Sequence, residues 1–132
     1  MDSRLYGLAR ELRSKPAAEA VTWLLHRYPL HSLNWGEALT LIGHCSFPRK
    51  ETRVLATYYL TTPAPHASGR AYVLFARLLG ITGLLNVLKE IDVKPGDRDL
   101  LLYYLEPILR EAKNKRDLLA VSTFMERTIP PL

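Results

Sequence analysis

The sequence predicts an all-α protein of about eight short antiparallel helices, and three observations carry this prediction. Apolar residues recur at the i, i+3, i+4, i+7 spacing of a buried helical stripe along most of the 132 residues. Prolines, glycines and capping residues interrupt this pattern at short intervals, as they do at the ends of short helices. The two segments that could form strands, RAYVLFA (residues 70–76) and LLLYYL (100–105), do not alternate apolar with polar residues.

Four helices are expected in the first half of the chain. Their predicted buried stripes are Leu5, Leu8, Ala9 and Leu12; Ala17, Ala20, Val21, Leu24 and Tyr28; Ala38, Leu39, Ile42 and Cys45; and Val54, Leu55, Tyr58 and Tyr59. We expect Ser14 to cap the second helix and Pro29 to end it. Asn34 and Glu37 have the spacing of a capping box for the third helix, and Pro48 begins the fourth.

Four more helices are expected after the loop TTPAPHASG (residues 61–69), whose prolines cannot extend a helix. Their predicted stripes are Tyr72, Phe75, Ala76 and Leu79; Ile81, Leu84, Leu85 and Leu88; Leu101, Leu105, Ile108, Leu109 and Ala112; and Leu118, Leu119, Ser122 and Met125. Ser68 is placed to cap the first of these helices, and Gly80 to end it. Asp97 is placed to cap the seventh helix, which Pro107 is expected to kink.

Two segments of the chain share the letters YYL: ATYYLTTP (residues 56–63) and LLYYLEP (101–107). Tyr59 and Tyr104 are 45 positions apart, within the period of about 40–47 residues found in HEAT and armadillo repeats. On this spacing the chain resembles a short HEAT-like α-solenoid, which implies stacked helical hairpins along its length. The alternative is an aromatic pair with one ring in the core and the other at its rim, without repetition.

Length and composition indicate one domain spanning residues 1–132. The net charge of +5 favours acidic partners, such as an acidic protein face, nucleic acid or an anionic surface. A single cysteine fits a reducing compartment, and the N-terminus lacks the apolar segment of a secretory signal. The most apolar stretch, residues 71–88, contains Arg77 and two glycines, which favours buried helices over a membrane span. We therefore predict a cytoplasmic protein.

Catalytic, metal and cofactor sites are not predicted. His44 and Cys45 are neighbours on a helix and point about 100° apart, and Cys45 falls on an apolar stripe, so a core thiol is expected. The four histidines lack the short spacing of zinc ligands. Asp97 and Asp99 suit the first turn of a helix, where the dipole favours negative charge. With no nucleotide-binding or hydrolase motif either, we predict a protein that is not an enzyme.

Basic residues gather in two clusters near predicted turns. The clusters are Arg49, Lys50 and Arg53, and Lys113, Lys115 and Arg116. The first cluster lies at a helix N-terminus, where the dipole disfavours cations, so helix stability does not explain it. Corresponding turns of a solenoid lie on one edge, so the clusters are expected to form one basic edge. An ordinary solvated surface is the alternative, because acidic residues are interspersed.

These features together predict a protein–protein interaction domain, either an adaptor or a stoichiometric inhibitor such as a toxin-immunity protein. The basic edge would contact an acidic protein surface. Trp35, Tyr59 and Tyr104 are the aromatic anchors we expect wherever they prove exposed, because interfaces concentrate energy in Trp, Tyr and Arg. The alternative function is nucleic-acid binding, which is less favoured because aromatic residues are not interleaved with the basic ones.

Overall fold

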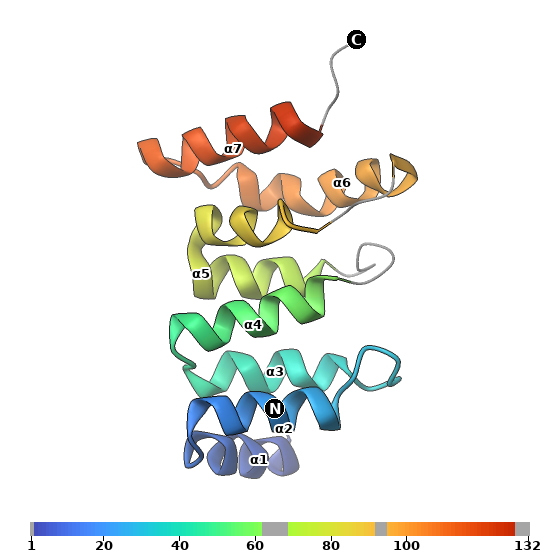
Figure 1. Ribbon diagram of the computed structural model, residues 1–132, viewed down its shortest axis with the longest axis vertical. Helices are drawn as coiled ribbons and strands as arrows, with labels where there is room; N and C mark the ends of the chain where they lie inside the picture. Colours follow the sequence, from blue (N-terminus) through green and yellow to red (C-terminus); the bar gives the residue numbers. More distant parts are fainter. Residues whose placement is uncertain (1, 62–68, 92–94, 129–132) are drawn as a thin grey trace. The chain divides into compact units, whose positions relative to one another are not determined.

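The computed structural model describes residues 2–61, 69–91 and 95–128, and these ranges contain helices and no strand. The helices are α1 (Ser3–Arg13), α2 (Ala17–Arg27), α3 (Gly36–Cys45), α4 (Arg49–Leu60), α5 (Arg70–Leu88), α6 (Arg98–Leu109) and α7 (Lys115–Thr128), with a 3-10 turn η1 (Pro95–Asp97) (Figure 1). The all-α prediction is confirmed. The chain divides into two compact units, Met1–Leu55 and Ala56–Leu132, so that α4 begins in the first and ends in the second.

The first unit is built on the packing of α1 against α3. The residues that these helices and α2 bury are Leu5, Ala9 and Leu12; Ala20, Val21 and Leu24; and Ala38, Leu39, Leu41, Ile42 and Cys45. They coincide with the stripes predicted from helical spacing, except that Leu8 and Ala17 are only half-buried and that Leu41, which was not predicted, is buried. The helical period therefore identified the core face of each of these helices.

Polar contacts at both ends show that α1 and α3 run in the same direction. Near the two N-termini, Arg4 donates to Glu37 with Nη2 and Oε2 2.5 Å apart. Near the two C-termini, the Arg13 guanidinium donates to the carbonyl oxygen of His44 at 2.9 Å. That carbonyl belongs to the last turn of α3, where carbonyl groups lack an intrahelical partner. α2 makes the return connection between these two parallel helices.

The second unit is organised around α5, which packs against both α6 and α7. Gly80 interrupts α5 with φ 78° and ψ 168°, a conformation essentially restricted to glycine. The fifth and sixth predicted helices are thus the two halves of α5, and Gly80 separates them as expected. The residues that α5 buries come from both halves: Ala71, Tyr72, Phe75, Leu79, Ile81, Gly83, Leu84, Leu85, Val87 and Leu88.

By length and composition, α5 alone among the described helices could cross a membrane. Of the 18 consecutive residues that form its most apolar segment, 56% are buried by packing within the protein. The break at Gly80 also divides it into segments too short to span a bilayer of about 30 Å. Both features match a helix that forms the core of a packed helical unit.

Several predicted caps are wrong. Ser14 ends α1, donating its hydroxyl to the Glu11 carbonyl, and Pro16 precedes α2 without a side-chain cap. Asn34 forms no capping box, because α3 begins at Gly36 and the Glu37 carboxylate is held by other side chains. Asp97 does occupy the N-cap position of α6, but its side chain makes no capping hydrogen bond. Ser68 lies outside the described residues.

The predicted stripe of the last helix is also wrong. Leu118 and Leu119 are 50% and 69% exposed, whereas Phe124 is buried. The sequence contains two overlapping apolar faces in α7, and the packing of α5 selects the one that includes Phe124. Leu119 is thereby left on the surface, where it contributes to the groove described below.

Candidate functional site

The basic residues at the start of α4 are exposed and lie side by side. Arg49, Lys50 and Arg53 line a shallow hollow of about 340 Å³ on the first unit. Just inside the helix, the buried Thr52 hydroxyl donates to the carbonyl oxygens of Phe47 and Pro48 at 3.2 and 3.0 Å. These hydrogen bonds fix the first turn of α4, and the three cationic side chains project from this end of the helix. These three basic residues are the lining of the hollow, and no hydrophobic residue in the described ranges contributes to it.

The second predicted cluster lies at the start of α7, in the second unit. Lys113, Lys115 and Arg116 are all exposed. Arg116 differs from the other two because it lines a groove between α5 and α7. The expectation that both basic clusters form one edge is still a prediction.

The aromatic residues predicted as interface anchors fall into different environments. Tyr59 is completely buried and does not meet the requirement of exposure. Trp35 and Tyr104 are half-buried, and the Tyr104 ring packs over Gly69, where an added Cβ would lie 3.0 Å from its Cδ1 atom. The exposed member of the second YYL is instead Tyr103, at 70%. Its ring meets that of Tyr104 edge to face, with ring centroids 5.3 Å apart.

Cys45 is buried at the end of α3, as expected for a core thiol. Burial raises the pKa of this thiol, which disfavours the thiolate that a nucleophile requires. The neighbouring His44 is exposed, and its ring contacts that of Tyr6 edge-on. In the described ranges no three histidine, cysteine or acidic side chains gather as metal ligands would.

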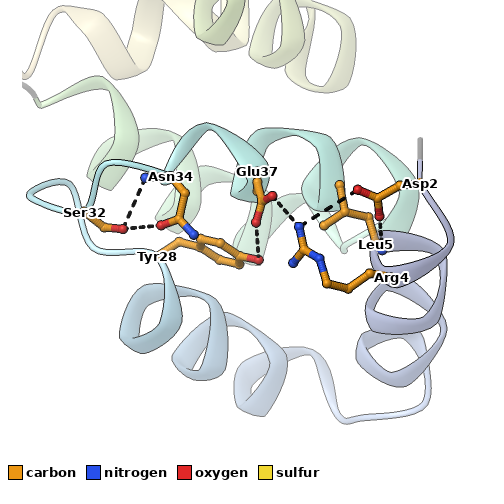
Figure 2. Close-up of polar contacts among 7 residues, drawn as sticks. All are labelled: Asp2, Arg4, Leu5, Tyr28, Ser32, Asn34 and Glu37. Carbon is orange, nitrogen blue, oxygen red and sulfur yellow. Dashed lines mark hydrogen bonds and ion pairs between the residues drawn. The ribbon is translucent and has the colours of Figure 1, made fainter.

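The first unit contains a polar cluster that joins α1, α2 and α3 (Figure 2). The Tyr28 hydroxyl donates to Glu37 Oε1 at 3.0 Å, while Arg4 binds the other carboxylate oxygen. Asp2 lies 4.0 Å from the Arg4 guanidinium and caps α1 by accepting from the Leu5 amide at 2.9 Å. Figure 2 also shows Ser32 bonded to Asn34 in the preceding turn.

The ionisation of this cluster supports a structural role. The Arg4 bond, more than any other influence, lowers the pKa of the Glu37 carboxyl. Burial, together with the Glu37 contact, raises the pKa of Tyr28. Glu37 is therefore held as a carboxylate and Tyr28 as a neutral phenol at neutral pH. The phenol hydroxyl is the donor and the carboxylate the acceptor of the hydrogen bond between them. The cluster fixes the packing of three helices and presents no unused acid or base.

A second surface site is a groove of about 310 Å³ between the second half of α5 and α7. Its ten lining residues are Thr82, Leu85, Asn86, Lys89, Arg116, Leu119, Ala120, Thr123, Phe124 and Arg127. Leu85 and Phe124 are buried and form the floor, and Leu119 contributes an exposed apolar side chain. The site is concave and predominantly apolar, as binding sites in proteins commonly are.

Three of the lining residues are cationic and none is acidic. Lys89, Arg116 and Arg127 are all exposed. Within the described part of the chain, none of these three forms a salt bridge. The groove thus combines an apolar floor with a positively charged rim.

Asp117 determines the geometry of one end of the groove. Its Oδ1 atom accepts from the Thr82 hydroxyl at 2.6 Å and from the Thr82 backbone N–H at 3.3 Å. Asn114 caps α7, accepting from the Asp117 N–H at 2.8 Å and donating to Asp117 Oδ2 at 3.0 Å. The Thr82 bonds, as the largest influence, lower the pKa of the Asp117 carboxyl. The acidic residue nearest to Arg116 in the chain is therefore already used inside the fold.

Among the residues that line this groove, sequence reasoning assigned a binding role only to Arg116. The missed residues include Lys89, Arg127 and the exposed Leu119. A signal was available, because cations follow the apolar stripes on both helices at i+3 and i+4 spacings. It could not be interpreted without knowing that the second half of α5 lies beside α7.

Comparisons with protein-family models, with curated proteins and with solved structures find no match to this chain.

Proposed function

We propose that this protein is a non-enzymatic recognition domain that binds an acidic protein partner through the α5–α7 groove. The observation that carries the proposal is the combination of an apolar floor with three cationic rim residues and no acidic one. Burial of Leu119 by a partner would contribute up to about 1.5–3 kcal/mol. The rim cations would select acidic partners and increase the rate of encounter.

The position of Arg116 supports a binding role. It lies in the first turn of α7, where the helix dipole disfavours a cation. The adjacent Lys115, in the same turn, places a second positive charge beside it. A partner carboxylate would relieve this unfavourable placement. In a chain of 132 residues, such a surface suits an adaptor or a stoichiometric inhibitor, including a toxin-immunity protein. The basic residues of α4 would be a further contact for the same class of acidic partner.

At the level of architecture we propose a stack of helical hairpins, as in α-solenoids. Contacts between parallel helices join residues 33 positions apart (Arg4 and Glu37) and 35 apart (Thr82 and Asp117). Such contacts between every second helix are expected when hairpins stack on one another. The offsets suggest a unit shorter than the period of about 40–47 residues in HEAT repeats, and close to the roughly 34 of helix–turn–helix repeats.

This shorter unit changes the interpretation of the YYL pair. Tyr59 lies in α4 and Tyr104 in α6, and the two halves of α5 lie between them in the chain. The tyrosines are therefore an odd number of helices apart. Equivalent positions in hairpin repeats are an even number of helices apart, so we propose that YYL is not the repeat signature.

A capture experiment with matched variants tests the proposed function. The tagged protein would be incubated with cytosol from its own source, with and without nuclease. Leu119→Asp and Arg116→Glu would be compared with Leu118→Asp and Lys115→Glu, which alter neighbouring exposed residues outside the groove. We expect one acidic protein that the first pair loses and the second pair retains. If all four variants retain the same proteins, the groove is not the binding site.

Nucleic-acid binding is the second candidate, favoured by the hollow that Arg49, Lys50 and Arg53 line. Phosphate contacts predict binding that weakens steeply with salt, by a slope of nearly one logarithmic unit per neutralised phosphate. The double variant Arg49→Glu with Lys50→Glu would abolish such binding, whereas Leu119→Asp would not affect it. Nucleic acid recovered by the wild type and lost by that double variant would favour this function over the first.

A further inference from the structure

The two walls of the α5–α7 groove are straight helical stripes. On α5 the lining residues Thr82, Leu85, Asn86 and Lys89 follow the i, i+3, i+4, i+7 pattern. On α7 the lining residues have the same spacings, beginning at Arg116 and ending at Arg127. Figure 1 shows the second half of α5 and α7 running in the same direction, and the contact of Thr82 with Asp117 joins their N-terminal ends. From Arg116 to Arg127 the stripe is about 16 Å long, or three helical turns.

Charge is distributed unevenly along this length. Arg116 lies at the N-terminal end of the groove, while Lys89 and Arg127 belong to the C-terminal ends of its two walls. The apolar residues Leu85, Leu119 and Phe124 lie between them along the helices. The groove therefore presents a cationic end, an apolar middle of about two turns and a second cationic end.

From this layout we propose that the occupant is an amphipathic helix of the partner, with an apolar stripe of about two turns and an acidic residue at each end of that stripe. The inference rests on the proposed function and names the form of the partner. Helices that lie in grooves between helices present anchors at i, i+3, i+4 and i+7, which matches the spacing of these walls. The cations at the two ends would then pair with carboxylates about three turns apart.

Other occupants fit the groove less well. An extended peptide that adds to a sheet needs an exposed strand edge, and the walls here are helices whose backbone groups bond internally. Nucleic acid would place phosphates along the rim but leave Leu119 without an apolar contact. A helix with an acidic–apolar–acidic face would pack its apolar residues on the floor and pair its acidic residues with the rim cations.

The probe for this inference is a synthetic helical peptide labelled with fluorescein. It carries Glu, Leu, Leu, Leu and Glu at the same spacing as Arg116, Leu119, Ala120, Thr123 and Arg127 on α7, in an alanine- and glutamine-rich background. Control peptides replace both Glu by Lys, replace the three Leu by Gln, or insert Pro at the centre to break the helix. Binding to the protein of residues 1–132 would be measured by fluorescence anisotropy.

We expect the acidic peptide to bind and each control peptide to bind at least about tenfold more weakly. Leu119→Asp and Arg116→Glu should weaken binding by a similar factor, while Leu118→Asp and Lys115→Glu should not. Circular dichroism and urea midpoints would establish that all four variants are folded. Each groove variant is paired with the same kind of change at a neighbouring exposed residue, so the comparison separates loss of binding at the groove from loss of the fold.

Three results would overturn the inference. If the Lys peptide binds as tightly as the acidic peptide, the occupant does not need acidic ends. If the Pro peptide binds as tightly as the acidic peptide, the occupant does not need to be helical. No binding by any peptide would reject a helical occupant of this kind. In that case the capture experiment still decides the proposed function: an acidic partner lost with Leu119→Asp would preserve it, and retention by all variants would reject both.

Discussion

Asp117 bonds to Thr82, 35 residues earlier in the chain, by accepting hydrogen bonds from both its hydroxyl and its backbone N–H. Gly80 interrupts α5, so the N–H groups that follow it lack intrahelical partners. The Asp117 carboxylate supplies one of these partners from a different helix, in place of a side chain at the N-cap. This relationship joins the second half of α5 to α7 and so holds the two walls of the groove.

Replacement of Asp117 by alanine should lower the free energy of unfolding by about 1–3 kcal/mol, because the Thr82 groups would lose a charged acceptor. The matched control is Asp99→Ala, since Asp99 is also in the first turn of a helix and is exposed. That control should cost no more than about 1 kcal/mol, the value of a favourable charge near a helix N-terminus. Urea unfolding of both variants measures the difference, and equal losses would contradict the role of the Thr82 contact.

Stability should fall in acid because Glu37 and Asp117 both have lowered pKa values in the folded protein. A lowered carboxyl pKa means that the folded state favours the charged form. Its stabilisation is complete above the ordinary pKa of about 4 and is lost as the pH falls through the folded value. Urea midpoints between pH 7 and pH 3 should decrease less steeply for Glu37→Gln than for the wild type. Parallel curves would contradict the contribution of Glu37.

Two glycines should respond in opposite ways to alanine. At Gly80 an added Cβ meets no atom within 4 Å, but φ 78° and ψ 168° are strained for alanine, so Gly80→Ala should cost about 1–3 kcal/mol. Gly7 is also free of neighbours within 4 Å and lies inside α1, so Gly7→Ala should add about 0.5–1 kcal/mol. Thermal and urea unfolding would measure both changes. A stable Gly80→Ala protein would mean that α5 is continuous in solution.

Cys45 should react slowly with thiol reagents in the native protein, because it is buried and burial raises the pKa of its thiol. Labelling should become fast in denaturant, and its native rate should rise in variants that destabilise the first unit. The control is Cys45→Ser carrying a new cysteine at the exposed Ser46, which should label rapidly in the native state. Native labelling of Cys45 at the rate of that control would reopen the question of a reactive thiol.

The sequence predicted the helices well wherever a single apolar face was present. The core residues Leu24, Ile42, Leu55 and Leu105 were all expected from their spacing, and each is almost completely buried. Side-chain capping was predicted less well, because Ser14 and Asn34 bond instead to Glu11 and Ser32, and the Asp97 side chain makes no capping bond. Glu37, the expected partner of Asn34, bonds instead to Tyr28 and to Arg4, which lies 33 residues earlier.

The predicted interaction residues show a similar division. The exposure of Arg49, Lys50, Arg53 and Arg116 could be expected from charge alone, because charged side chains are rarely buried without a partner. Which tyrosine of each YYL is buried depends on how the helix is rotated against its neighbours. The sequence could not supply that rotation: it placed Tyr58 and Tyr59 together on the buried stripe of the fourth helix, whereas only Tyr59 lies in the core.

By itself the sequence determined the helical class, the position of the break at Gly80 and the core location of Cys45. These depend on local spacing and on backbone conformations that only certain residues adopt. The tertiary structure alone decided that Lys89, Arg116 and Arg127 surround one groove, and that Leu119 lies in it. The physical reason is that a groove is a property of two helices, and the neighbour of a helix is chosen by packing between residues far apart in the chain.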